Sequence, residues 1–378
     1  MIYYLFSEYF SKGGLILRIA AAAMVGFAVV LLLGRRMIRM LIRRKLGDRP
    51  EFDHADLNEL TRHKSNTPTM GGALVVLAVF VSTLLFANLG NMYIRMAMLA
   101  LLWLGLLGGV DDWFKLRLAA GKGTRDGLKM WQKILFQIGL AVLLSIYIYS
   151  QGRESHVVDM AGRLVNPAHS FYFPFKSNPI YLPLLAHVII TVLTMVGSSN
   201  AVNLTDGMDG LASGCMVIVA AFFLLMAWIA GVAEWSRLFH LPLVAGAAEM
   251  TVLCAAMLGA CMGFLWYNAH PAQVFMGDTG SLPLGGLIGY VAVVTRQEIL
   301  LLIAGGVFVM EAVSVMLQVA YFKATRPADG VQGRRLFRCA PLHHHFHLGG
   351  WPESKVVVRF WLLGIVFAAI ALATLKLR

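Results

Sequence analysis

Cysteine is scarce in this chain, and the few cysteines do not form a pattern. The four are Cys215, Cys254, Cys261 and Cys339, with no C-x-x-C pair among them, and three fall inside apolar runs. Disulfide frameworks and zinc sites depend on paired or regularly spaced cysteines. Neither is therefore expected here.

The chain also lacks a soluble domain. Of its 378 residues 58% are hydrophobic, and the mean hydropathy is +0.71, whereas soluble domains are usually about 45–50% apolar. Apolar runs of about 17 to 25 residues, each long enough to cross a bilayer as a helix, recur from end to end with no polar domain between them. We therefore expect one polytopic membrane domain over residues 1–378.

Ten such runs predict the helices. They lie at residues 17–34, 71–90, 93–110, 133–150, 179–198, 210–231, 245–267, 280–296, 298–322 and 355–376. Because these runs are continuously apolar, whereas barrel strands alternate in short segments, the expected fold is an all-α integral membrane protein with about ten transmembrane helices. The first run is not an obvious signal peptide, since it is long, lacks an A-x-A-like site after it and precedes the basic stretch GRRMIRMLIRRK.

The net charge of +12 is unevenly distributed. Twenty of the 32 basic residues lie in three segments, residues 35–64, 115–133 and 323–338. The positive-inside rule places these segments in the cytoplasm and both termini outside. A nucleic-acid partner is not expected, because the basic residues stay at membrane edges and no soluble module could carry a groove reader. Anionic lipid head groups and phosphorylated substrates are the expected partners of this charge.

Five polar motifs fall on the expected cytoplasmic side. They are HKSNTPTMGG (63–72), VDDWFK (110–115), NAVNLTDGMDGLA (200–212), YNAHPAQVFMGDTGS (267–281) and APLHHHFH (340–347). Motifs placed at random would not all be expected on one side of ten spans. The sequence therefore predicts a single active site built from five inter-helix loops.

The acidic residues of these motifs each have two interpretations. Asp111 and Asp112 could mark the water interface with Lys115 as a helix-surface partner, but an unpaired carboxylate beside hydrocarbon is costly, which favours function. Asn203, Asp206 and Asp209 recur every three residues, so in a helix they share a face at the positive end of its dipole. An ordinary helix cap would need one such residue.

The glycine-flanked motifs are also open to two interpretations. Asp278, between Gly277 and Gly280, could simply cap a helix, or it could bind Mg²⁺, which takes one or two carboxylates together with substrate phosphates. Thr69 with the two glycines that follow could form a plain turn. Alternatively, the free backbone N–H groups of this turn, at the start of a helix, could bind an anion, and Lys64 would add positive charge.

Histidines cluster in the last motif as His343, His344, His345 and His347. Consecutive histidines are poorly spaced for zinc, and no cysteine assists them, so phosphate contact or proton transfer fits better. Glu249 and Glu311 lie inside apolar runs, where a functional role and a structural hydrogen bond carry equal weight. Acids, lysines, glycine-rich turns and histidines together predict phosphoryl transfer between a soluble phosphorylated substrate and a lipid phosphate.

Several segments carry a resemblance to a known family. TPTMGG, GGVDDWFK, NAVNLTDGMDGLA, NAHPAQVFMGDTGSLPLGG and APLHHHF with GWPES and VVRFW resemble, in order, the signature segments of the phospho-N-acetylmuramoyl-pentapeptide transferases. A sister group, the polyprenyl-phosphate N-acetylhexosamine-1-phosphate transferases, shares the acidic motifs. The triple histidine together with TPTMGG favours the first group.

The resemblance implies ten transmembrane helices, a homodimer, Mg²⁺ dependence and a place in the bacterial cytoplasmic (inner) membrane. UDP-MurNAc-pentapeptide and undecaprenyl phosphate would give lipid I and UMP in peptidoglycan synthesis. The alternatives are hexosamine-1-phosphate transfer to the same lipid and, in another class, a secondary transporter. Transporters, however, usually carry their coupling sites near the midplane of repeated halves.

The resemblance also implies residue roles. Asp111, Asp112 and Asp278 would be catalytic acids, with His343 beside them and Asp278 as the Mg²⁺ ligand. The expected nucleoside pocket consists of Lys64, Thr69, Asn203, Asp206, Gly207, Met208, Asp209 and Phe275, with Phe275 stacking on uracil. The groups expected at phosphates and sugar are Lys115, Lys133, Asn268, Gln318 and His343 to His345, and Gly277 is expected to be a further substrate-binding residue. Lys129 is an alternative to Lys133, and His347 and Cys339 depart from the family pattern and receive no role.

Two further expectations concern mechanism and the outer face. Asp111 would deprotonate or orient the lipid phosphate for direct attack on the β-phosphate, and the alternative is an aspartate nucleophile with a covalent intermediate. The segment at 154–175 alternates apolar and polar residues in places, which predicts a short hairpin.

Overall fold

The computed structural model describes residues 14–43, 64, 67–122, 127–151, 157–158, 164–174, 179–326 and 333–377. The helices are α2 (Gly14–Arg43), α4 (Gly72–Phe86), α5 (Met92–Lys122), α6 (Met130–Gln151), α7 (Leu184–Thr205), α8 (Leu211–Gly231), α9 (Ala233–Leu238), α10 (Met250–Asn268), α11 (Asp278–Thr295), α12 (Glu298–Ala304), α13 (Gly306–Ala324), α14 (Leu342–Leu348) and α15 (Glu353–Ala373). Short 3₁₀ turns η3 (Pro167–His169), η4 (Ala247–Glu249) and η5 (Thr374–Leu377) complete them. The expected all-α membrane fold is confirmed.

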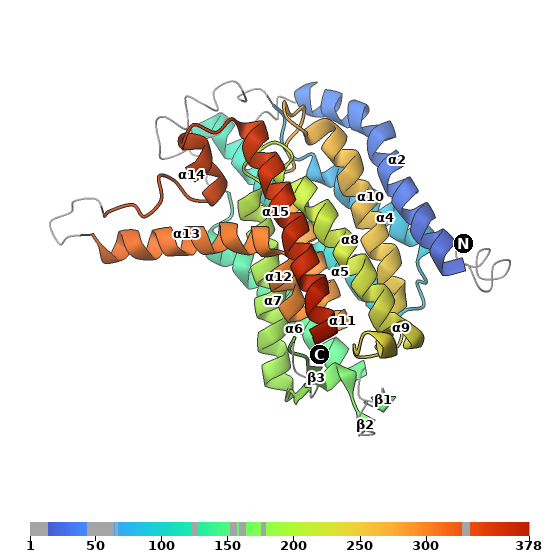
Figure 1. Cartoon of the computed structure of the whole chain (residues 1–378). Helices are drawn as coiled ribbons and strands as arrows, with labels where there is room; N and C mark the ends of the chain where they lie inside the picture. Colours follow the sequence, from blue (N-terminus) through green and yellow to red (C-terminus); the bar gives the residue numbers. More distant parts are fainter. Residues whose placement is uncertain are drawn as a thin grey trace.

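Among the described residues, the strands lie between residues 157 and 181. β1 (Val157–Val158) pairs antiparallel with β2 (Leu164–Val165), and β3 (Ser170–Phe171) pairs antiparallel with β4 (Ile180–Tyr181). The short hairpin expected within 154–175 is therefore present. In Figure 1 these strands lie at the end of the bundle opposite α14. Some basic residues of the segments 35–64 and 115–133, on which the predicted orientation depends, lie outside the described residues. These are Arg44, Lys45, Arg49, Arg62 and Arg125.

The count of ten spans is not confirmed. Within the described ranges, eight helices are long and apolar enough to cross a membrane by length and composition, and α4 is a shorter apolar helix. The chain is thus a multi-pass membrane protein. The remaining expected span, α11, has 18 residues, begins with the polar Asp278 and Thr279, and is buried along its whole length. Because protein surrounds α11, its residues need not be as apolar as those of a lipid-facing helix.

The expected continuous span at 298–322 is wrong. It is divided at Gly305 into α12 and α13, and Figure 1 shows α13 (orange) leaving the bundle across the direction of α15. The adjacent glycines at 305 and 306 explain the break, since glycine destabilises a helix interior and glycine-containing pairs are common kink sites.

The third helix extends beyond the expected edge at residue 110. α5 continues to Lys122, so Asp111, Asp112 and Lys115 lie on a helix and not in the loop that we expected. The segment after residue 110 has no proline or glycine before Gly121 to end the helix. The acids are accommodated because they face protein, with 0% and 4% of their surface exposed.

α11 lies at the centre of the bundle and packs mainly against α7, α5, α8 and α4. Gly108 allows the closest of these approaches, because a Cβ at this position would collide with the backbone of Asp278. This contact brings the last turns of the apolar part of α5 against the first turn of α11. The two acidic motifs therefore meet by backbone packing.

Glu249, one of the two acids inside apolar runs, pairs with Arg18 of α2. Both carboxylate oxygens accept hydrogen bonds from the Arg18 guanidinium at 2.7 and 2.8 Å, and the Asn88 N–H donates to one of them at 2.9 Å. Arg18 also donates to the Phe86 carbonyl. A bidentate pair of this kind ties α2 to the start of α10, which favours the structural interpretation of Glu249.

Candidate active site

Backbone hydrogen bonds join the first and fourth polar motifs. The Phe275 N–H donates to the Pro68 carbonyl, and the N–H groups of Gly71 and Gly72 donate to the carbonyls of Phe275 and Met276, each at 2.8 Å. The segments 68–72 and 275–276 therefore run side by side. As a result α4 and α11 begin next to each other, with Thr69 buried beside Gly277.

Asp111 and Asp278 share two lysines. The Lys115 ammonium lies 2.7 Å from Asp111 Oδ2 and 3.3 Å from Asp278 Oδ1, and the Lys133 ammonium lies 3.2 Å and 3.0 Å from the Oδ2 atoms of the same two acids. Asn203 donates its amide to Asp278 Oδ1 at 2.8 Å. Residues from α5, α6, α7 and α11 thus converge. Lys133 is the lysine placed here, whereas Lys129 is exposed.

Asp112 has a different environment from its neighbour. Its carboxylate accepts hydrogen bonds from the backbone N–H groups of Asp278 (3.2 Å) and Thr279 (2.9 Å) and from the Thr279 hydroxyl (2.6 Å). Adjacent residues on a helix point about 100° apart, so Asp111 faces the lysines while Asp112 faces the helix start. Asp112 therefore caps the N-terminus of α11 from another helix and fixes the position of Asp278, the first residue of α11.

Asp206 lies at the end of α7 and touches the same region. Its carboxyl accepts a hydrogen bond from the Gly277 N–H at 3.1 Å. Burial raises the pKa of Asp206 well above its usual range, and the nearby carboxylates of Asp278, Asp112 and Asp209 raise it further. Ionisation of Asp206 is therefore less favourable than that of a surface aspartate.

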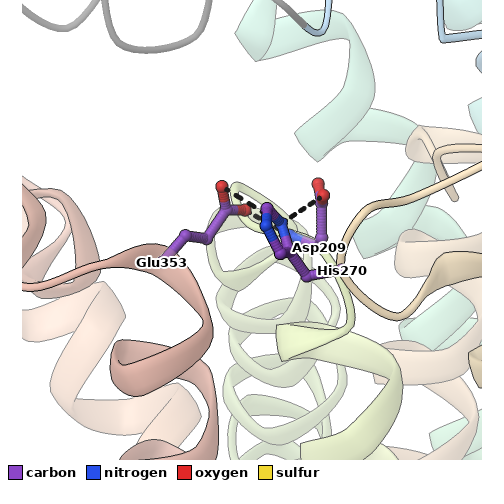
Figure 2. A group of neighbouring side chains, drawn as sticks. All are labelled: Asp209, His270 and Glu353. Carbon is purple, nitrogen blue, oxygen red and sulfur yellow. Dashed lines mark hydrogen bonds and ion pairs between the residues drawn. The ribbon is translucent and has the colours of Figure 1, made fainter.

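A second ionic cluster surrounds Lys64. Its ammonium lies 2.6 Å from Asp209 Oδ1 and 2.5 Å from Glu353 Oε1, and Figure 2 shows the His270 ring between the two carboxylates. His270 Nδ1 is 3.1 Å from Asp209 Oδ2, and the Asp209 N–H donates to Glu353 Oε1 at 2.8 Å. Although burial opposes the shift, the Lys64 ammonium lowers the pKa of Asp209. The Lys64 ammonium also lies 5.9 Å from the centroid of the Phe275 ring.

Glu353 and His270 were not among the predicted site residues. Both stand in segments that carry the resemblance, GWPES and NAHPAQ, so a signal was present. Their proximity to Asp209 depends on α15 beginning beside the turn at 206–210, which the sequence does not reveal. Met208 in that turn is buried, and Gly207 permits close contact with α14.

The three consecutive histidines of α14, His343 to His345, differ in their surroundings. His343 is fully buried with its Nδ1 3.1 Å from Glu311 Oε2, and His344 is 4% exposed. Burial lowers the pKa of His344 well below its usual range, and His343, His347 and Lys64 lower it further, so His344 is neutral. His345 instead accepts a hydrogen bond from the Arg338 N–H through Nδ1 at 3.1 Å.

Asn268 and Gln318 hold backbone segments. The Asn268 amide oxygen accepts from the Gly210 N–H (3.1 Å) and the Ser213 hydroxyl (2.9 Å), and its nitrogen donates to the Val274 carbonyl (3.0 Å). The Gln318 oxygen accepts from the N–H groups of residues 336 and 337, and its nitrogen donates to the carbonyl of residue 337. Their expected contacts with phosphate or sugar stay predictions.

Comparison with known proteins shows what the chain is similar to. Residues 94–296, just over half of the chain, match the model of glycosyl transferase family 4. The chain is 44% identical over 363 residues to the phospho-N-acetylmuramoyl-pentapeptide-transferase of Desulfotalea psychrophila. The aligned residues cover 96% of this chain and 94% of the relative. The chain belongs to the phospho-N-acetylmuramoyl-pentapeptide transferase family. The resemblance of the motifs is thereby confirmed, and the chain is a membrane transferase of this family.

The donor atoms of the acidic cluster fit the divalent cation expected for this transferase family. Asp111, Asp112 and Asp278 are all buried, and each offers an oxygen within 4.8 Å of the others, which is the oxygen-rich environment that a hard cation prefers. The three carboxylates outnumber the two lysines paired with them. Asp209, His270 and Glu353 also lie within 4.8 Å of one another, but there a single ammonium, that of Lys64, contacts both carboxylates at 2.6 and 2.5 Å, so we describe that group as an ion network.

Proposed function

We propose that this chain transfers phospho-MurNAc-pentapeptide from UDP-MurNAc-pentapeptide to undecaprenyl phosphate, which gives lipid I and UMP in peptidoglycan synthesis. The observation that carries the proposal is the convergence of Asp111 and Asp278 on Lys115 and Lys133 in a chain of this family. Both substrates are phosphate esters, and such transfer depends mainly on positioning and neutralisation of charge.

The two buried clusters divide the substrate between them. Lys64, Asp209 and Phe275 would hold the uridine, with uracil stacked on the aromatic ring. Lys115 and Lys133 would contact the diphosphate after exchanging part of their pairing with the acids. Asp278, with Asp111 and Asp112 beside it, would hold Mg²⁺, and the bound cation would supply neutralisation of the diphosphate charge.

Asp111 is the proposed base. It would orient or deprotonate the phosphate of undecaprenyl phosphate, whose oxygen forms a new bond to the β-phosphorus as the bond from that phosphorus to UMP breaks. The alternative is attack by an aspartate, which would leave a phospho-sugar on the enzyme. Labelled nucleotide offered without lipid decides between them: a trapped adduct that disappears in Asp111→Asn would contradict the direct route.

The proposed setting is the bacterial inner membrane, with the clusters on the cytoplasmic side, both termini outward and two copies in a homodimer. The charge distribution supports this orientation, since Arg35, Arg36, Arg39 and Arg43 lie in the last turns of α2. This face is where a soluble nucleotide and a lipid phosphate can both arrive.

Release of UMP by the purified protein in detergent tests the proposal. Mg²⁺ and undecaprenyl phosphate are supplied, and UDP-MurNAc-pentapeptide and UDP-N-acetylglucosamine are offered separately to wild type, Asp278→Asn and Glu234→Gln. Glu234 is an exposed acid of α9, remote in the fold, so its variant controls for loss of one charge. We expect release with the pentapeptide nucleotide alone, lost in Asp278→Asn only. Release with only the simple sugar would assign the chain to the sister reaction.

A further inference from the structure

Glu311 is a buried acid that the proposed reaction does not use. It lies in the first half of α13, and none of its surface is exposed. A carboxylate inside a membrane protein is costly unless it is paired. A partner that donates hydrogen bonds to this carboxylate is therefore expected.

That partner is His343. Glu311 Oε2 lies 3.1 Å from His343 Nδ1, and Glu311 Oε1 accepts a hydrogen bond from the His343 backbone N–H at 3.2 Å. One carboxylate thus holds both the ring and the main chain of the same histidine. The pair fixes the rotation of the imidazole and ties α14 to α13.

The other ring nitrogen is directed toward the turn at 206–210, beside which we propose that the nucleotide binds. His343 Nε2 is fully buried and has no hydrogen-bond partner among the described residues. It faces Gly207, where an added Cβ would collide with the imidazole. Gly207 lies between Asp206 and Asp209 in the turn that also contacts the two ionic clusters, so a buried polar atom is aimed at the place where a substrate is expected.

The chemistry of this ring follows from its partners. A carboxylate that accepts from Nδ1–H requires a proton on Nδ1, and Nε2 can donate to a phosphate oxygen only if it also carries a proton, so the ring would hold protons on both nitrogens when the nucleotide is bound. The neighbouring ring of His344 has its centroid 4.1 Å away, and because burial lowers its pKa, we expect it to be neutral at pH 7 and to leave the carboxylate to His343. Phosphate oxygens of a nucleotide are acceptors near pH 7, so a useful Nε2 must donate.

We propose that Glu311 is a positioning residue that keeps Nδ1 of His343 protonated and directs Nε2–H at a phosphate oxygen of the bound nucleotide. This inference rests on the proposed function. The carboxylate, the imidazole and the phosphate would form one line of charge-assisted hydrogen bonds. His343 would then stabilise charge on the diphosphate as UMP leaves.

A double-mutant cycle tests the relationship. UMP release is measured for wild type, Glu311→Gln, His343→Ala and the double variant, with Ser314→Ala as a matched control one turn further along α13, where Ser314 is equally buried. We expect kcat/KM to fall on the order of tenfold or more in Glu311→Gln, with no further fall when it is added to His343→Ala. Ser314→Ala should retain wild-type kcat/KM. Additive losses would instead assign Glu311 a purely structural role and overturn the proposal.

A spectroscopic readout separates this inference from the proposed reaction. Solid-state NMR of ¹⁵N-histidine protein in bilayers, assigned by difference against His343→Gln, reports the proton on Nδ1 without any substrate. We expect a protonated Nδ1 in wild type and in Glu311→Asp, which keeps the carboxylate, and a changed signal in Glu311→Gln. An unprotonated Nδ1 in wild type would contradict the inference even if UMP is released. A protonated Nδ1 without UMP release would refute only the proposed reaction.

Discussion

The Asp112 carboxylate accepts a hydrogen bond from the backbone N–H of Asp278 at 3.2 Å. One acid of the site therefore fixes the position of another, and the two belong to helices that are far apart in the sequence. Asp111, the neighbour of Asp112, instead lies between two lysines. Two adjacent aspartates of one motif thus have separable roles.

Replacing each aspartate by asparagine should separate these roles. Asp112→Asn keeps one acceptor but presents an amide to a second N–H group, so we expect it to lower the free energy of unfolding by about 1–2 kcal/mol and to reduce activity through the displaced α11. Asp111→Asn should leave the melting temperature closer to that of wild type and abolish UMP release. Thermal unfolding in detergent and UMP release check both. Equal melting temperatures for the two variants would contradict the capping role.

Glu353→Gln should act on nucleotide binding. The variant leaves Lys64 with one carboxylate and weakens the acceptor that holds the Asp209 N–H. Because Glu353 is part of the Lys64 network and not of the Asp111–Asp278 cluster, we expect KM for the nucleotide to rise on the order of tenfold with little change in kcat. The exposed neighbour Ser354 provides the control Ser354→Ala. A fall in kcat at unchanged KM would show that Glu353 acts on the reaction and not on binding.

The sequence predicts some of these relationships and not others. The shared position of the polar motifs follows from the apolar runs and the basic segments, since alternating spans return the chain to the same face. Asp111 and Asp112 cannot be distinguished from sequence, because their difference arises from the rotation of α5 against α11. The pairing of Glu311 with His343 is likewise hidden, since it depends on how α14 folds back on α13. The break at Gly305 lies within an apolar run whose hydropathy gives no sign of it.

The pH dependence of stability should reveal the raised pKa of Asp206. Because its pKa is raised in the folded state, mainly by burial, the folded protein favours the protonated carboxyl more than the unfolded chain does. Its stability contribution is complete below the unfolded pKa of about 4 and is lost as the pH rises through the folded pKa. Asn mimics the protonated form of Asp206. We therefore expect the melting temperature of Asp206→Asn to fall less steeply with rising pH than that of wild type, when thermal unfolding is followed with a chelator present. Parallel curves would mean that Asp206 is ionised in the fold.

Removal of the divalent cation should affect both activity and stability. A ligand that binds only the folded state stabilises it by about 2.7 kcal/mol at one hundred times its dissociation constant, so Mg²⁺ should raise the melting temperature of wild type and a chelator should reverse the rise. Asp278→Asn should lose the Mg²⁺-dependent rise, while Glu353→Gln should retain it because the Lys64 network does not hold the cation. Rescue of chelated enzyme by Mg²⁺ completes the test through UMP release. A rise that survives in Asp278→Asn but disappears in Glu353→Gln would place the cation at Asp209, His270 and Glu353, and the assignment of the two clusters would have to be exchanged.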